Sequence, residues 1–336
     1  MIQISNLKLQ IPHTTKRLKE KALKQLHIRE QDLIGFRIAK RSLDARKKPV
    51  LYYVYTLELS VKNEAGLQKK NLPKNVNVCK AKPIYAPVPT GTETLAHAPM
   101  IAGSGPAGLF CAYSLAKMGY APVLVERGED VDTRMQDVEA FWNGGSLKPN
   151  SNVQFGEGGA GTFSDGKLNT LVHDKEGRGR AVLETFVKFG APEEILWESK
   201  PHIGTDILIE VVERMREEII RLGGEFLFHS QVTDILPKEN CLIVNGCHRI
   251  ETDAAVFAVG HSARDTFQML FDRNVAMKSK SFAIGVRAEH RQDMIDEAMY
   301  GRKERGPLGA AAYKLTAQLE NGRGVYTFCM CPGGYV

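Results

Sequence analysis

Three glycines and one acid have the types and the spacing that hold a nucleotide through its phosphates. Gly103, Gly105 and Gly108 form a Gly-x-Gly-x-x-Gly pattern directly after an apolar run, and Glu126 follows 23 residues after the first of them. The glycines allow a tight turn, close approach of a pyrophosphate, and close packing of helix on strand. Helix N–H groups then bind the phosphates, and the acid accepts hydrogen bonds from ribose hydroxyls. We therefore predict a dinucleotide site, with a ligand-free glycine turn as the weaker alternative.

The elements around this pattern predict an α/β, Rossmann-like domain. A strand over 99–103, a helix over 108–118 and a strand over 121–126 make one βαβ unit. Farther along, residues 206–222 have the apolar spacing of an amphipathic helix. Strands are expected over 225–236, 242–244 and 254–259.

The charge distribution predicts a separate N-terminal unit. Residues 1–90 hold 19 basic and 6 acidic residues, whereas the remainder holds 26 basic and 33 acidic ones. Thr14 precedes Leu18, Ala22, Leu23 and Leu26 at helical spacing, and residues 50–61 are rich in aromatic and β-branched types. We expect a basic α+β domain over 1–90, which ends in the proline-rich stretch 81–99.

Composition excludes several classes of protein. The 336 residues are 43% hydrophobic and 25% charged, as in ordinary globular proteins. Neither a bilayer-spanning apolar run nor a secretory signal is visible. Six cysteines in so long a chain form no disulfide framework. We therefore expect a cytoplasmic protein with reduced thiols and no membrane partner.

Several segments resemble FAD-dependent oxidoreductases of the glutathione-reductase type. The run Gly-Ser-Gly-Pro-Ala-Gly at 103–108 and the Glu-Arg-Gly at 126–128 are similar to their first βαβ unit. Residues 254–261 resemble their late strand beside the flavin, with Val259 in place of threonine, and residues 221–235 resemble the segment that meets the adenine. The resemblance implies FAD-binding roles for Ser104, Pro106, Ala107, Arg127, Val232, Ala258 and Gly260 in addition to Gly103, Gly105, Gly108 and Glu126.

The glycine-rich run 154–168 is the most distinctive segment. It suits a backbone nest in which Gly158 and Gly159 approach the ligand, although a flexible linker is the alternative. With residues 200–206 and 326–334, it resembles the uncharacterised FAD-dependent (NAD-utilising) dehydrogenase family. That resemblance implies an FAD-binding domain over 97–270 and an incomplete antiparallel β substrate domain over 271–336. It also implies that the chain is C-terminally truncated and retains FAD weakly.

No catalytic residue is predicted. His202 and His261 lie in glycine-containing loops, and Lys167 and Arg287 could stabilise a reduced flavin, but each has a more ordinary interpretation. The Cys-Met-Cys run at 329–331 lacks the second pair that zinc sites need, so we expect core cysteines and no metal. Residues 311–319 and 324–331 predict a hairpin, which joins a strand over 282–289 to cover the flavin.

These features predict an FAD-dependent oxidoreductase that passes a hydride or an electron pair between small molecules. NAD(P)H is the candidate donor, although no second glycine pattern is visible for it. The alternative is an FAD-containing, RNA-interacting or tRNA-modifying protein. That alternative depends on the basic cluster Lys40, Arg41, Arg46, Lys47 and Lys48, which by default is a solvated surface.

Overall fold

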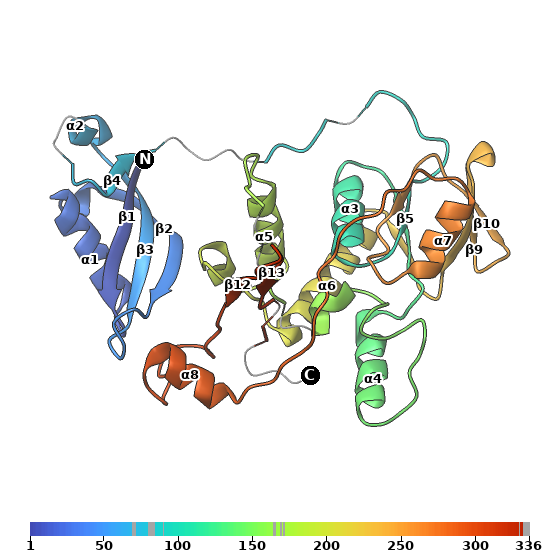
Figure 1. Cartoon of the computed structure of the whole chain (residues 1–336). Coiled ribbons are helices and arrows are strands. Elements are labelled where there is room, and N and C mark those ends of the chain that lie inside the picture. Colours follow the sequence, from blue (N-terminus) through green and yellow to red (C-terminus); the bar gives the residue numbers. More distant parts are fainter. Residues whose placement is uncertain are drawn as a thin grey trace.

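A computed structural model describes residues 1–68, 72–79, 85–89, 91–163, 166–168, 170, 172–328 and 330–331. Figure 1 shows an N-terminal sheet at one end of the molecule and a second α/β unit at the other. Each unit has its own buried cluster of apolar side chains.

The N-terminal unit is a four-stranded antiparallel sheet with one helix. Its elements are β1 (Ile2–Gln10), α1 (Thr15–Leu26), β2 (Leu33–Asp44), β3 (Tyr52–Val61), the short α2 (Glu64–Gln68) and β4 (Val76–Val78), and the strand order is β2-β3-β1-β4. The Thr14 hydroxyl accepts from the N–H of Arg17 and caps α1, as its position predicts. The buried Leu18, Ala22 and Leu26 join the apolar face of the sheet, so the helical spacing is confirmed.

The second unit contains a parallel sheet with the order β11-β5-β6-β7. Its strands are β5 (Met100–Ala102), β6 (Val123–Val125), β7 (Glu225–Leu227) and β11 (Ala255–Phe257). Helix α3 (Pro106–Lys117) connects β5 to β6, and α6 (Thr205–Arg221) precedes β7. The predicted βαβ unit is confirmed. The run 225–236 is divided, however, because residues 228–231 leave the parallel sheet.

Other elements surround this sheet. An antiparallel sheet with the order β10-β9-β8 contains β8 (Val232–Leu236), β9 (Cys241–Val244) and β10 (His248–Glu251). The remaining helices of this unit are α4 (Val131–Trp142), α5 (Arg178–Lys188) and α7 (Arg264–Asp272), none of which the sequence analysis anticipated. No helix in the described ranges has the length and apolar character needed to span a membrane.

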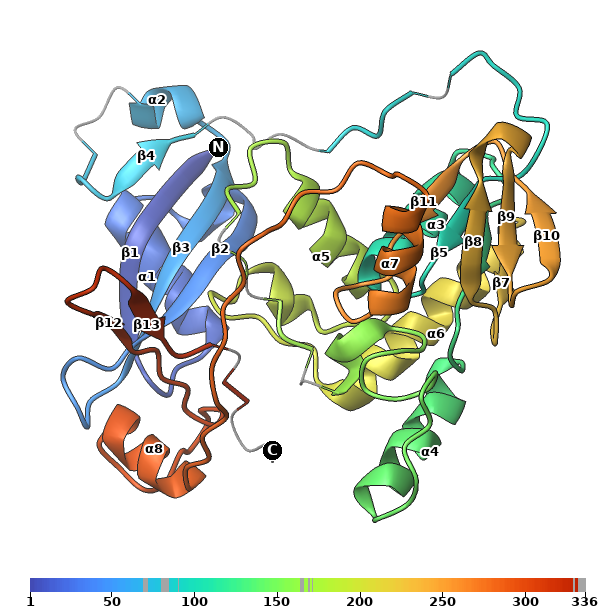
Figure 2. The same cartoon turned by 45° about the vertical axis from the view of Figure 1, so that its right-hand side comes forward.

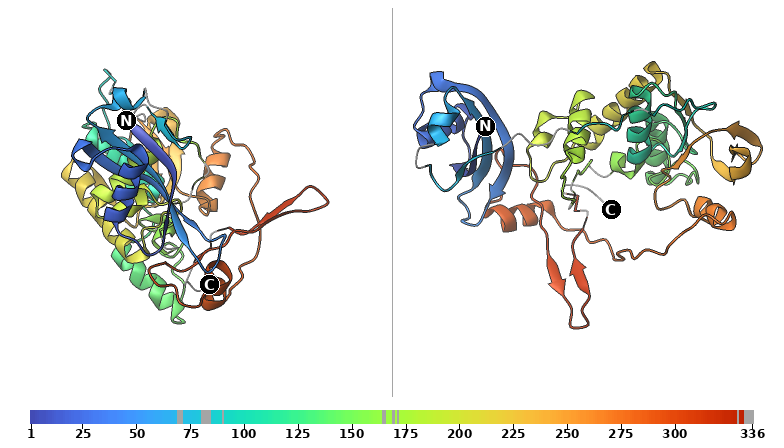
Figure 3. Two further views of the ribbon diagram at one scale, coloured as in Figure 1. Left: turned by 90° about the vertical axis from the view of Figure 1, so that its left-hand side faces the viewer. Right: turned by 90° about the horizontal axis from the view of Figure 1, so that it is seen from above.

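The C-terminal part differs most from expectation. The predicted strand over 282–289 is wrong: this segment has no hydrogen-bonded neighbour strand among the described residues, and Phe282, Ile284 and Val286 are 84%, 89% and 96% exposed. The hairpin is confirmed but short, with β12 (Thr316–Gln318) and β13 (Gly324–Tyr326) around the Asn-Gly turn. Both views in Figure 3 show this hairpin projecting from the body of the molecule.

The segment between these pieces packs on the N-terminal unit. Figure 2 shows the chain after α7 crossing to α8 (Gln292–Tyr300), beside the N-terminal sheet. There Ile295, Tyr300 and Leu308 share a buried cluster with Ile11 and Leu51. The described part of 271–336 is therefore a connecting segment, a helix and a hairpin. The pairing partners that a β domain needs are absent from the described residues.

Candidate functional site

The three motif glycines have different structural roles. Gly103 has φ +101°, and a Cβ there would lie 2.6 Å from the carbonyl oxygen of Ala258. A Cβ on Gly108 would lie 1.8 Å from the carbonyl oxygen of Gly103, so this glycine permits the close contact of α3 with the turn. Gly105, the N-cap of α3, has space instead: its nearest neighbour would be the Cα of Gly159, 3.9 Å away. Gly103 and Gly108 thus allow the tight turn, whereas Gly105 leaves free space beside it.

The carboxylate of Glu126 ties this turn to the glycine-rich loop. Its Oε2 accepts from the N–H and the hydroxyl of Ser104 at 2.8 and 2.7 Å, and its Oε1 accepts from the N–H groups of Gly128 and Gly156 at 3.0 and 3.1 Å. A carboxylate has about four lone-pair sites. All four are engaged here, so a ribose hydroxyl that binds Glu126 has to share or replace one of these donors.

The buried guanidinium of Arg134 on α4 organises the loop over 152–163. It donates to the carbonyl oxygens of Asn152 at 2.9 Å, Val153 at 3.1 Å and Gly159 at 2.9 Å, and it lies 4.7 Å from the centre of the Phe163 ring. Burial lowers its pKa to about 10, which leaves it charged at neutral pH. The flexible-linker alternative for 154–168 is therefore wrong for its described residues 154–163. Ser164, Asp165 and Asn169 lie outside the described residues.

Glu157 connects the same loop to two helices. Its Oε2 accepts from the N–H of Val131 at the start of α4 and from the guanidinium of Arg216 on α6, while its Oε1 has no hydrogen-bond partner among the described residues. Burial raises the pKa of Glu157 to about 7, against the opposing effect of Arg216. A carboxyl that titrates near neutral pH therefore lies beside the glycine turn.

A polar cluster joins four elements near Glu126. The guanidinium of Arg127 binds both carboxylate oxygens of Asp265 at 2.9 Å, donates to the Thr266 hydroxyl at 3.1 Å and lies 4.4 Å from the centre of the Phe155 ring. Gln231, just before β8, donates to Asp265 at 2.8 Å. The Arg127 guanidinium holds the pKa of the Asp265 carboxyl below its usual range.

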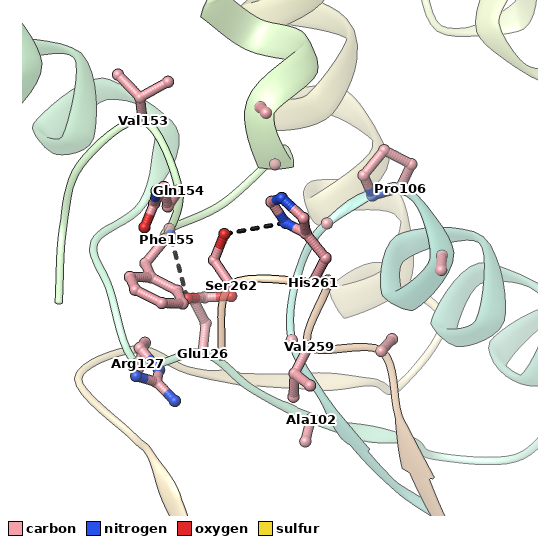
Figure 4. A pocket seen from close by; sticks show the side chains of 18 of the residues that line it. Ala102, Pro106, Glu126, Arg127, Val153, Gln154, Phe155, Val259, His261 and Ser262 are labelled. Carbon is pink, nitrogen blue, oxygen red and sulfur yellow. Dashed lines mark hydrogen bonds between the residues drawn. The ribbon is translucent and has the colours of Figure 1, made fainter. Parts of the chain in front are cut away.

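Gly103, Gly105, Glu126 and Arg127 are among the residues that line a cavity of about 1370 Å³. Figure 4 shows Glu126 and Arg127 with the loop residues Gln154 and Phe155 on one side, Pro106 on the other, and His261 between them. Among the residues predicted to bind cofactor, those that line the cavity are Gly103, Gly105, Pro106, Ala107, Glu126, Arg127, Gly159, Val232, Ala258 and Gly260. Ser104, Gly108 and Gly158 lie behind its wall, where Ser104 is fully buried and its carbonyl accepts from the N–H of Gly158.

The other candidate residues are divided between the cavity and its surroundings. His261 lines the cavity, and its Nδ1 lies 2.9 Å from the Ser262 hydroxyl. Arg287 and Cys331 also line it, and the Lys167 ammonium is 2.7 Å from the Cys331 sulfur. His202 pairs through its backbone with Lys167 and does not line the cavity. Cys329 lies outside the described residues.

The contributors that were missed from the sequence include Arg134, Glu157 and Asp265. Arg134 and Asp265 stand in helices that lacked a motif, and their side chains meet the site only through tertiary packing. Glu157 did carry a signal, because it is the single acid among the first glycines of the loop. A charged residue amid so many small ones suggests a buried partner.

Known families match three parts of the chain. Residues 1–60 match a domain of unknown function, residues 101–165 match an NAD(P)-binding Rossmann-like domain, and residues 281–336 match a family described as "FAD-dependent protein, C-terminal domain-like". The fold and these matches therefore define a Rossmann-like α/β protein whose C-terminal residues are similar to an FAD-dependent protein family.

An uncharacterized protein of Clostridium beijerinckii is 46% identical over 340 residues; the match covers the whole chain and 63% of that relative's length. Thermovibrio ammonificans THI4 is a solved structure with 18% identity and a TM-score of 0.35, over 54% of this chain and 64% of the other. Glycine oxidase from Geobacillus kaustophilus has 12% identity and a TM-score of 0.34, over 53% of this chain and 59% of the other.

Proposed function

We propose that the cavity binds FAD and that the protein is an FAD-dependent oxidoreductase acting on a small molecule. The observation that carries the proposal is the open space at Gly105, at the N-terminus of α3 and opposite Gly159. The first N–H groups of a helix have no intrahelical acceptor and favour an anion, so the N–H of Ala107, which lines the cavity, suits the pyrophosphate. At about 1370 Å³, the cavity exceeds the roughly 300–1,000 Å³ that drug-sized ligands occupy.

The residues of the chain then have separate tasks. Glu126, Val232 and Arg127 bound the adenosine end, while Gly103, Gly159 and Pro106 bound the pyrophosphate. Ala258, Gly260 and His261 lie along the remaining wall, where the Nδ1 of His261 is 2.9 Å from the Ser262 hydroxyl. FAD, when bound, supplies two-electron oxidation and reduction. The chain contributes binding, orientation and exclusion of water.

The proposal is tested by titrating the purified protein with FAD and following flavin fluorescence. Gly105→Val should lose FAD binding, because its side chain fills the pyrophosphate position. Gly105 has an ordinary φ of −67° and open space, so thermal stability should change little. Gly309→Ala is the matched control, since a Cβ there meets nothing within 4 Å and the glycine lies outside the cavity. Full FAD binding by Gly105→Val would refute the assignment.

We further propose that a nicotinamide, if it is the electron donor, binds without a Rossmann unit of its own and outside the adenosine end. This is tested by adding NADH or NADPH anaerobically to the FAD-loaded protein and recording flavin absorbance. Bleaching identifies the donor. No described contact favours the RNA alternative: in the basic cluster, Arg41 pairs with Glu198 and Arg46 with Asp44.

A further inference from the structure

The residue after the acid of a Rossmann-type site is well placed to decide which adenosine is accepted. Such sites bind a free ribose 2′-hydroxyl through the acid, or a 2′-phosphate through a nearby arginine. Here both residue types are present, as Glu126 and Arg127, and both line the cavity. The arginine's availability therefore matters.

The guanidinium of Arg127 is not free to bind a phosphate group of a ligand. Both ends of its guanidinium fork lie on the Asp265 carboxylate at 2.9 Å, one nitrogen also binds Thr266, and one face of the group covers Phe155. The side chain is 11% exposed, whereas that of Asp265 is 51% exposed. Asp265 is itself positioned by the amide of Gln231. Glu126, whose buried carboxylate lines the cavity, adds a negative charge at this end, while Asp265 lies outside the lining and acts through Arg127.

We propose that Asp265, by holding Arg127, makes the adenosine end selective for a nucleotide without a 2′-phosphate. The inference depends on the proposed function, since it concerns the same cavity. A 2′-phosphate would meet the like charge of Glu126 and would find the Arg127 guanidinium already paired with Asp265, and repulsion of this kind is an effective means of discrimination. It follows that a nucleotide with a 2′-phosphate is excluded from the adenosine end, whereas FAD, whose adenosine ribose carries a free 2′-hydroxyl, is accepted there.

The test uses 5′-ADP and 2′,5′-ADP as probes in calorimetric titrations of the whole chain. The wild type should bind 5′-ADP at least tenfold more tightly than 2′,5′-ADP. Asp265→Asn should narrow that ratio by roughly tenfold, through tighter binding of 2′,5′-ADP, because a released guanidinium gains a charge-assisted bond to phosphate. Arg127→Gln combined with Asp265→Asn should abolish the gain, since the guanidinium is gone.

Asp234→Asn is the matched control. Asp234 on β8 also pairs with an arginine of the α7 region, Arg273, but neither residue lines the cavity. Loss of this ion pair should leave the ratio of the affinities for 5′-ADP and 2′,5′-ADP unchanged. Equal binding of both probes by the wild type, or an unchanged ratio in Asp265→Asn, would overturn the inference alone. Binding of neither probe by the wild type would overturn the proposed function together with it.

Discussion

At the scale of single residues, Glu157 gives the site a pH-dependent component. Its folded-state pKa of about 7 lies above the ordinary value of 4.5, so the folded state holds a proton that the unfolded state releases. Stability from this group is therefore complete below pH 4.5 and is lost as the pH rises through 7. Glu157→Gln should flatten the fall of Tm between pH 5 and 8, as measured by thermal unfolding.

Glu218 provides the control for that experiment. Arg221 lowers its pKa to about 2, so its contribution is present above pH 4.5 and lost only as the pH falls toward 2. Glu218→Gln should leave the slope between pH 5 and 8 as in the wild type. An unchanged slope in Glu157→Gln would mean that Glu157 is ionised in the folded protein at pH 5.

Arg134 tests how far the loop over 152–163 depends on one side chain. Lysine keeps the charge, but its ammonium cannot reach the carbonyls of Asn152, Val153 and Gly159 together. Arg134→Lys should cost about 3 kcal/mol of stability, because buried carbonyls lose their donors. Hydrogen exchange within 152–163 should rise. Arg178→Lys, at an exposed ion pair with Glu176, is the control and should change neither the stability nor the exchange rate. If hydrogen exchange within 152–163 stays slow in Arg134→Lys, the loop is held by its own backbone and not by Arg134.

At the scale of elements, the segment 276–290 exposes alternate apolar side chains. Phe282, Ile284 and Val286 lie on the surface, and extended apolar segments of this kind favour association. Ile284→Lys should leave Tm within the error of the wild type, since little packing is lost. It should also reduce concentration-dependent light scattering. A fall in Tm of several degrees would show that Ile284 is packed in solution.

The same segment shows why the sequence predicted some elements and not others. The run 99–126 specified its own strand, turn and helix, because Gly103 and Gly108 fix local geometry. The alternation of apolar and other residues over 282–289 can give a strand only if a neighbouring strand supplies backbone hydrogen bonds. No strand among the described residues pairs with this segment. The residues in and around the cavity divide in the same way. Motif residues were predictable, whereas Arg134 and Asp265 depend on contacts between distant elements.

At the scale of the molecule, the N-terminal sheet and the second α/β unit are joined by an exposed stretch and are also in contact with each other. The described residues 85–89 and 91–96 are exposed and without helix or strand. Across the junction, the N–H of Arg41 donates to Trp197 at 2.7 Å and the N–H of Ser199 donates to Arg41 at 3.0 Å. The guanidinium of Arg41 also pairs with Glu198. The N-terminal unit is therefore linked to the second α/β unit through space as well as through the chain.

This arrangement predicts that cutting the connection does not separate the units. A site for a specific protease, inserted between Gly91 and Thr92, should be tolerated because the backbone there is exposed. After cleavage, the two pieces should co-elute in gel filtration, held by Arg41 and by the apolar cluster that Ile295 and Tyr300 share with Ile11 and Leu51. Adding Arg41→Ala should weaken the association, whereas Arg46→Ala, whose partner Asp44 lies in the same unit, should not. Separate elution of the cleaved pieces without either substitution would show that the covalent connection alone keeps the units together.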